Sequence, residues 1–107
     1  MLEKHHIIFK SSGGLDFDLN YKHLTAIKHR GNKGPHMNRE TDLQYKMELE
    51  ERLREIFNLD SYLLSEVIEL LALDIKQAQK AFKRLESVDG IEREDIIYKL
   101  MGDRYYL

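Results

Sequence analysis

The spacing of apolar residues changes at Thr41, and this change divides the chain into two differently patterned parts. After it, large apolar side chains recur every three or four residues, at Tyr45, Leu49, Leu53 and Ile56. Such a stripe is typical of one face of an amphipathic helix. We therefore expect a helix at about 42–57, with Thr41 and Gln44 at the spacing of a capping box.

The part before this helix has short β-branched and aromatic runs separated by glycine-containing loops. Residues 5–9 predict a first strand that ends before the loop at Gly13 and Gly14, because paired glycines permit turn conformations. Residues 21–27 predict a second strand. Residues 30–38 contain two glycines and the only proline, so we expect a loop there.

The remainder predicts three short helices, at about 65–71, 74–85 and 92–101, with Asp74 as the N-cap of the second. The first two, with a tight link at 72–74, have the pattern of a helix-turn-helix. The same pattern is common in helical modules that only pack against other helices.

The fold class predicted from these elements is α+β. A short ββα unit at 1–57 is followed by a small helical module at 58–107. Two short strands and one helix bury little apolar area. We therefore expect the helical module to pack on the first unit and to be needed for stable folding.

Length and composition exclude several classes of protein. A chain of 107 residues is enough for one small domain and too short for a large multi-pocket enzyme. No membrane span is expected, because no apolar run approaches roughly 20 residues. No signal peptide is expected either, because Met1 is followed almost directly by charged and imidazole side chains. Without cysteine there is no disulfide and no thiolate metal site, which suits a cytoplasmic protein. Any metal would be bound by nitrogen and oxygen.

Charge is distributed unevenly along the chain. Residues 1–46 carry 8 Lys and Arg against 5 Asp and Glu, whereas residues 47–107 carry 9 against 14. The basic part also contains all five histidines, which are His5, His6, His23, His29 and His36. A polyanion would be attracted to this part first, although an ordinary solvated surface explains the asymmetry equally well.

The adjacent His5 and His6 are the first candidate for chemistry. Neighbouring side chains on a strand point to opposite faces, so one imidazole can bind a metal ion while the other faces a substrate. Imidazole serves both as a metal ligand and as a general base near neutral pH. The pair alone is also compatible with the start of an ordinary surface strand.

Further positions strengthen the functional interpretation. The chain has His-His-Ile-Ile at 5–8, Gly-Gly at 13–14, Asn20, and His29 directly before Arg-Gly at 30–31. The separations are 14 residues from His6 to Asn20 and 9 from Asn20 to His29. Over about residues 3–45 this pattern resembles that of the HNH (ββα-metal) endonucleases, in particular the small proteins of phages and mobile elements.

The resemblance implies a role for each matching residue. His6 would be the general base that deprotonates water, and His5 and His29 would hold one divalent ion, with Zn, Ni, Mn and Mg as candidates. Asn20 would pin the loop between the strands and so aim the base. His36 is a rival or additional ligand because the helix of the motif is delayed by the 31–35 loop, and it can equally be an ordinary loop histidine.

Other polar residues have weaker predicted roles. Phosphate contacts are predicted for two sets of basic side chains, Lys10, Arg30, Lys33 and Arg39 around the proposed site and Lys76, Lys80, Lys83 and Arg84 on the helix-turn-helix-like segment. For any one of them, plain solubility is the better explanation. His23 is predicted to be a structural, half-buried strand residue.

The function predicted by this resemblance is metal-dependent hydrolysis of phosphodiester bonds, seen as nicking of DNA, in a bacterial host cytoplasm. One alternative is a DNA-binding protein, such as a phage regulator, on a degenerate nuclease fold. Another is a phage protein that inhibits a host protein or defence complex, with the helical half as the contact surface.

Overall fold

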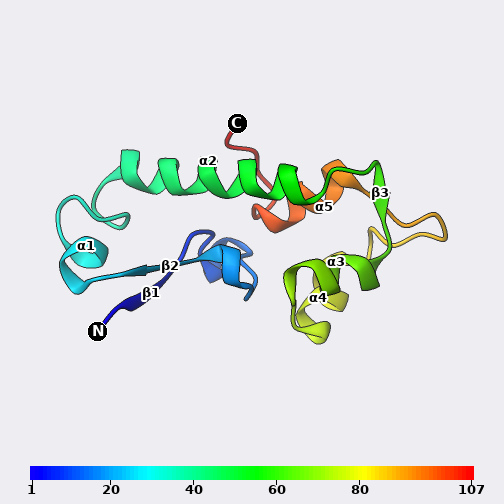
Figure 1. Cartoon of the computed structure of the whole chain (residues 1–107), viewed down its shortest axis with the longest axis horizontal. Coiled ribbons are helices and arrows are strands. Elements are labelled where there is room, and N and C mark those ends of the chain that lie inside the picture. Colours follow the sequence, from blue (N-terminus) through cyan, green and yellow to red (C-terminus); the bar gives the residue numbers. More distant parts are fainter.

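A computed structural model describes all residues, 1–107, and shows a mixed α+β fold built along one long helix. This helix, α2 (Arg39–Ile56), runs along the long axis of a molecule measuring 47 × 26 × 21 Å (Figure 1). The predicted helix at 42–57 is thus confirmed, but the capping box at Thr41 is wrong. Asn38 caps the helix instead, because its side chain accepts a hydrogen bond from the Thr41 backbone N–H.

At one end of α2 lies a two-stranded antiparallel sheet, in which β1 (Glu3–His6) pairs with β2 (Tyr21–Leu24). Both predicted strands exist, but the first spans residues 3–6 instead of 5–9, and the second ends at residue 24 instead of 27. After His6 the chain turns into a loop with short 3₁₀ turns at Lys10–Ser12 and Asp18–Asn20.

The second strand ends early because a helix begins there. Thr25 caps α1 (Ala26–Arg30) by accepting a hydrogen bond from the Lys28 N–H. The strand predicted to reach residue 27 is therefore too long, and His29 lies in the last turn of α1.

The other end of the molecule contains α3 (Leu64–Leu71), α4 (Ile75–Phe82) and α5 (Arg93–Leu100) (Figure 1). All three predicted helices are confirmed, the second ending three residues early, and Asp74 caps α4 as expected. Two strands were not predicted. They are β3 (Ser61–Tyr62) and β4 (Ile91–Glu92), which pair with each other and join the loops that precede α3 and α5.

The core is one cluster of 17 buried side chains. Only Ile7, Ile8 and Phe17 come from the part before α2, and 11 members lie beyond Phe57. Helix α2 contributes Leu49 and Leu53 near its C-terminal end. Apolar burial is therefore concentrated where the helices meet, and it is continuous between the two parts of the chain.

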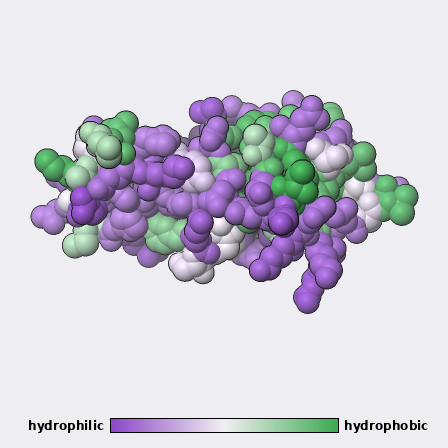
Figure 2. Space-filling model, turned by 90° about the horizontal axis from the view of Figure 1, so that it is seen from below, coloured by the Kyte–Doolittle hydropathy of each residue, from purple (hydrophilic) through white to green (hydrophobic).

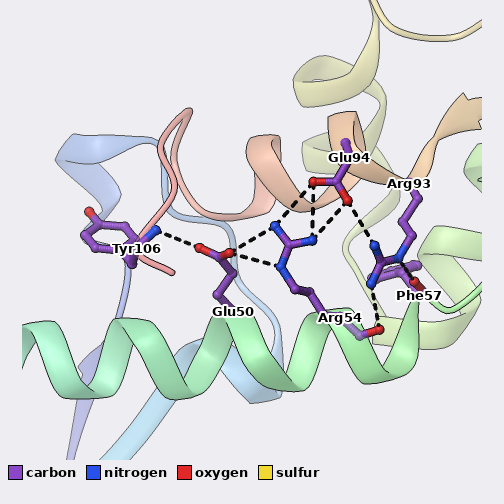
Figure 3. A network of polar contacts seen from close by, with 6 residues as sticks. All are labelled: Glu50, Arg54, Phe57, Arg93, Glu94 and Tyr106. Atoms are coloured by element: carbon purple, nitrogen blue, oxygen red, sulfur yellow. Dashed lines mark hydrogen bonds and ion pairs between the residues drawn. The ribbon is translucent and has the colours of Figure 1, made fainter.

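A polar network reinforces the junction of α2, α5 and the C-terminus (Figure 3). The Glu50 carboxylate is fully buried and accepts hydrogen bonds from Arg54 and from the Tyr106 backbone N–H. Arg54 also pairs with Glu94 of α5, and Arg93 donates to backbone carbonyls at the end of α2. The buried charge is thus fully partnered, as burial requires.

The face of the molecule opposite α2 is mostly hydrophilic, and its hydrophobic side chains gather mainly over the half that contains α3 and α4 (Figure 2). None of the helices combines the length and the apolar character that a membrane span requires.

Candidate metal centre

Three histidines from three separate segments converge at the sheet end of the molecule. His5, His29 and His36 can each offer one nitrogen, and these atoms all lie within 4.8 Å of one another. The three rings form a nearly equilateral triangle, with centroid separations of 5.1, 4.9 and 4.8 Å. The structure thus brings together all the residues predicted as metal ligands, including His36.

Local structure explains how each histidine reaches the cluster. His5 points inward from β1 and is only 2% exposed, whereas His29 comes from the last turn of α1. The loop that carries His36 folds back because Gly34 packs against the α1 backbone. A Cβ on Gly34 would lie 2.4 Å from the Lys28 carbonyl oxygen and 2.7 Å from that of His29. A side chain at this position would push the third histidine away.

Two of the three nitrogen separations are near those found around a single metal ion. The His29 Nε2 atom lies 3.3 Å from His5 Nδ1 and 3.0 Å from His36 Nε2. An unprotonated imidazole nitrogen has one lone pair and cannot accept two good hydrogen bonds at once. Nitrogens bound at about 2.0–2.1 Å to a tetrahedral ion lie about 3.3 Å apart. The three histidines are therefore close enough together to hold one divalent cation.

A carboxylate orients one of the three rings. Glu3 Oε1 lies 2.9 Å from His29 Nδ1, and Glu3 Oε2 accepts a hydrogen bond from Arg30 at 2.8 Å. The hydrogen bond with His29 is the main reason that the pKa of Glu3 is lowered. An ionised carboxylate holds the His29 proton on Nδ1 and leaves Nε2 free to bind a metal, as in many carboxylate–histidine–metal sites.

Glu3 was not predicted as a site residue. Its signal in the sequence was the alternation of a strand, which places residues 3 and 5 on the same face. Nothing in the spacing showed that His29 would lie beside it, because no helix was predicted at 26–30.

The surroundings of His5 favour the neutral form of its imidazole. Burial, followed by the proximity of His36 and His29, lowers the pKa of His5 to about 4. The ring is therefore neutral near pH 7, with a lone pair available. Its Nε2 atom is buried without a hydrogen-bond partner, as is Oδ1 of Asp42 at the start of α2.

His6 lies in a different polar environment from its neighbour, as strand alternation predicts. Its Nε2 atom is 2.9 Å from Asp16 Oδ1, and its ring packs edge-on against Tyr21. The side chain is 23% exposed, so one of its edges meets solvent. The cluster and the predicted base are therefore on adjacent residues but do not share partners.

Asn20 is completely buried and joins the segments around the sheet. Its Oδ1 accepts from the Ile8 N–H at 2.8 Å, and its Nδ2 donates to the carbonyls of Ile8 and Leu15. These are the contacts that pinning the loop after β1 requires. A contribution of Asn20 to catalysis stays a prediction.

The predicted phosphate-binding residues all have exposed side chains, which are Lys10, Arg30, Lys33, Arg39, Lys76, Lys80, Lys83 and Arg84. Two of them are already paired with acids near the site, Lys10 with Asp16 and Arg30 with Glu3. The other six make no ion pair within the chain and are free to meet phosphates.

The prediction for His23 is wrong. It is paired with Lys4 across the sheet and is exposed, whereas the next residue, Leu24, points inward. The strand alternates here, and His23 falls on its outer side. His23 takes no part in the histidine cluster.

Comparisons with known proteins gave no assignment: no family model, curated protein or solved structure matches the chain. The functional argument therefore depends on the chemistry of the residues described above.

Proposed function

We propose that this protein is a metal-dependent endonuclease of the HNH type that nicks DNA. The observation that carries the proposal is that two adjacent histidines lie in separate environments. His5 belongs to a three-histidine cluster, whereas His6 belongs to a separate pair with Asp16. A hydrolase that uses a metal ion and a general base needs both environments close to each other.

The metal would be held by His5, His29 and His36, with Glu3 fixing the orientation of His29. When bound, a divalent ion would stabilise negative charge on the phosphate in the transition state. Nitrogen ligands favour zinc, nickel or manganese over magnesium.

His6 would take a proton from a water molecule. Because Nε2 faces Asp16, the free nitrogen Nδ1 accepts this proton, and the resulting hydroxide attacks phosphorus. The P–O bond opposite the attacking oxygen breaks, and the leaving oxygen takes a proton from solvent. Asn20 holds the backbone of Ile8 and Leu15, so that the strand ending in His6 keeps its direction.

The substrate would be held mainly through its phosphates. Lys33 and Arg39 flank the loop that carries His36, and Lys76, Lys80, Lys83 and Arg84 lie on and just after α4. Such contacts give affinity that is independent of base sequence and falls with salt. We propose DNA as the partner on this basis.

The test is nicking of supercoiled plasmid with Mn²⁺, Ni²⁺, Zn²⁺ or Mg²⁺. The wild type should nick, and His6→Ala should reduce the rate by about 10² to 10⁴ while binding metal normally. His5→Ala should lose both metal binding and nicking. His23→Ala is the matched control, because this exposed strand histidine touches neither the cluster nor Asp16, and it should nick like wild type.

Two other results would replace the proposal. A wild-type protein that cuts no plasmid, single-stranded DNA or RNA but shifts DNA in a gel would be a DNA-binding protein on a degenerate nuclease fold. A protein that neither cuts nor binds nucleic acid would favour the inhibitor of a host protein.

A further inference from the structure

Asp16 is the residue through which the sheet end and the helical end share a polar contact. It lies in the loop between β1 and β2, and its hydrogen-bond partner Gln77 lies 61 residues away on α4. The two residues bond reciprocally. The Asp16 N–H donates to Gln77 Oε1 at 3.0 Å, and Gln77 Nε2 donates to Asp16 Oδ2 at 2.8 Å.

The other partners of the Asp16 carboxylate are all hydrogen-bond donors or cations. Oδ1 accepts from the Tyr21 hydroxyl at 2.8 Å and lies 2.9 Å from His6 Nε2. Oδ2 also lies 3.4 Å from Lys10 Nζ. These donors, and His6 first among them, hold the pKa of Asp16 well below its usual range.

An ionised carboxylate can only accept hydrogen bonds. The hydrogen between Asp16 and His6 therefore belongs to His6 Nε2, and the lone pair of the imidazole is on Nδ1. This is the tautomer that a base acting through Nδ1 must have. Asp16 can also stabilise the positive charge that His6 acquires when it takes a proton.

We infer that Asp16 is a positioning residue for His6, and that Gln77 holds Asp16 in place and so makes helix α4 part of the site. For its catalytic meaning the inference rests on the proposed function. It also changes the interpretation of α4. The helix is anchored to the loop beside the base through Gln77, so phosphates bound by its exposed Lys76 and Lys80 would have a set position relative to His6.

The experiment begins with the tautomer of His6, which requires no nuclease activity. In ¹⁵N-labelled wild-type protein at pH 7.5, the ring nitrogen signals of His6 should show a protonated Nε2 and a bare Nδ1. Asp16→Asn should lose this preference, because an asparagine amide can donate to Nε2 and so stabilise the opposite tautomer. Gln77→Ala should weaken it, and Gln79→Ala, a change at an exposed position of the same helix, should leave it unchanged.

Plasmid nicking by the same proteins is the second measurement. Asp16→Asn should lower kcat by about 10² to 10⁴ with KM changed less than about threefold, because positioning acts on the chemical step. Gln77→Ala should lower kcat by about tenfold, and Gln79→Ala should have no effect.

The outcomes separate the two proposals. An Nδ1–H tautomer in the wild type, or an unchanged tautomer in both Asp16→Asn and Gln77→Ala, would overturn the inference whatever the activity. The expected tautomers in a wild type that never cuts would leave the positioning contact standing and reject the nuclease. If Asp16→Asn does not fold, the His6 tautomers of the wild type and of Gln77→Ala are sufficient to test the inference.

Discussion

The histidine end and the helical end of this molecule are held together by different forces. The helical end has 11 of the 17 core side chains, and the junction with α2 adds a fully partnered buried carboxylate, Glu50. At the histidine end, no residue between 20 and 44 belongs to the core, and the buried Leu24 lies outside it. Contacts there include polar ones, such as those of Glu3 with His29 and Arg30, and aromatic ones, such as the stacking of Phe9 on His36.

This difference indicates that one end supplies most of the stability and the other holds the candidate site. Apolar burial is the dominant favourable term in folding, so the helical end should set the global stability. The histidine end is small, contains no disulfide, and brings three imidazoles together outside the main apolar core. A cation bound there would act as a cross-link that stabilises this small unit.

The largest expected effect concerns the apolar core. Leu53→Ala, at a fully buried position of α2, should lower the free energy of unfolding by about 2–5 kcal/mol. Leu24→Ala, at the histidine end, should lower it by about 1–2 kcal/mol, because that site is less enclosed and can relax. Urea denaturation measures both. Equal losses would show that the two ends contribute alike and would break the comparison.

Metal addition should act on the opposite end. With Zn²⁺ or Ni²⁺ at 100 times its Kd, the wild type should gain about 2.7 kcal/mol of unfolding free energy, because only the folded chain brings the three imidazoles together. Calorimetric titration should give one ion per chain. His29→Ala should abolish both effects, and His23→Ala should change neither. A stabilisation that survives in His29→Ala would place the ion elsewhere.

Removal of the orienting carboxylate should have a smaller effect. Glu3→Ala should weaken metal binding by about 10- to 100-fold, because His29 loses the partner that fixes its tautomer. Glu40→Ala, which changes an exposed acid near the start of α2, is the control for net charge. Competition with a chelating dye gives both affinities. Equal affinities would mean that the Glu3 contact does not support the site.

The smallest expected effect is a pH dependence. The folded-state pKa of Asp16 is far below its ordinary 3.8, first because of the hydrogen bond from His6. Its stabilisation is therefore complete above about pH 5 and is lost as pH falls through 3.8 toward the folded-state value. The side chain is 29% exposed, so we expect about 1 kcal/mol or less.

The measurement compares the wild type with Asp16→Asn by urea denaturation in metal-free buffer. The wild type should be the more stable at pH 6, and its advantage should shrink by pH 3. A constant difference at all pH values would show that the carboxylate charge does not stabilise the junction of the two ends.

Much of the fold follows from local pattern. The apolar stripe of α2 and the cap at Asp74 depend on neighbouring residues, so they were predictable. The strands β3 and β4 were not, because two residues are too few to show a period. At Ala26 the cap from Thr25 outweighed the strand propensity of Ile27, and a helix formed in place of the strand end.

The residues of the candidate site also fall into a predictable group and a group that could not be predicted. The three clustered histidines and Asn20 stand at spacings that suggested them in advance. Glu3, Asp16 and Gln77 were missed because each acquires its partner only when the chain folds, and the partner of Gln77 is 61 residues away. Residue type alone does not distinguish these three from ordinary surface polar residues.

The pairing of β1 with β2 has a consequence for insertions and deletions. His6 stands opposite Tyr21, and His5 stands opposite Lys22. A slip of this short ladder by one residue would turn every side chain to the other face, so that only one of the two imidazoles would stand where a histidine stands now. An insertion that caused such a slip would leave both histidines in the chain, yet each would leave its present environment. A change of register by one residue in the four-residue strand β1 would therefore disturb the site more than many single substitutions around it.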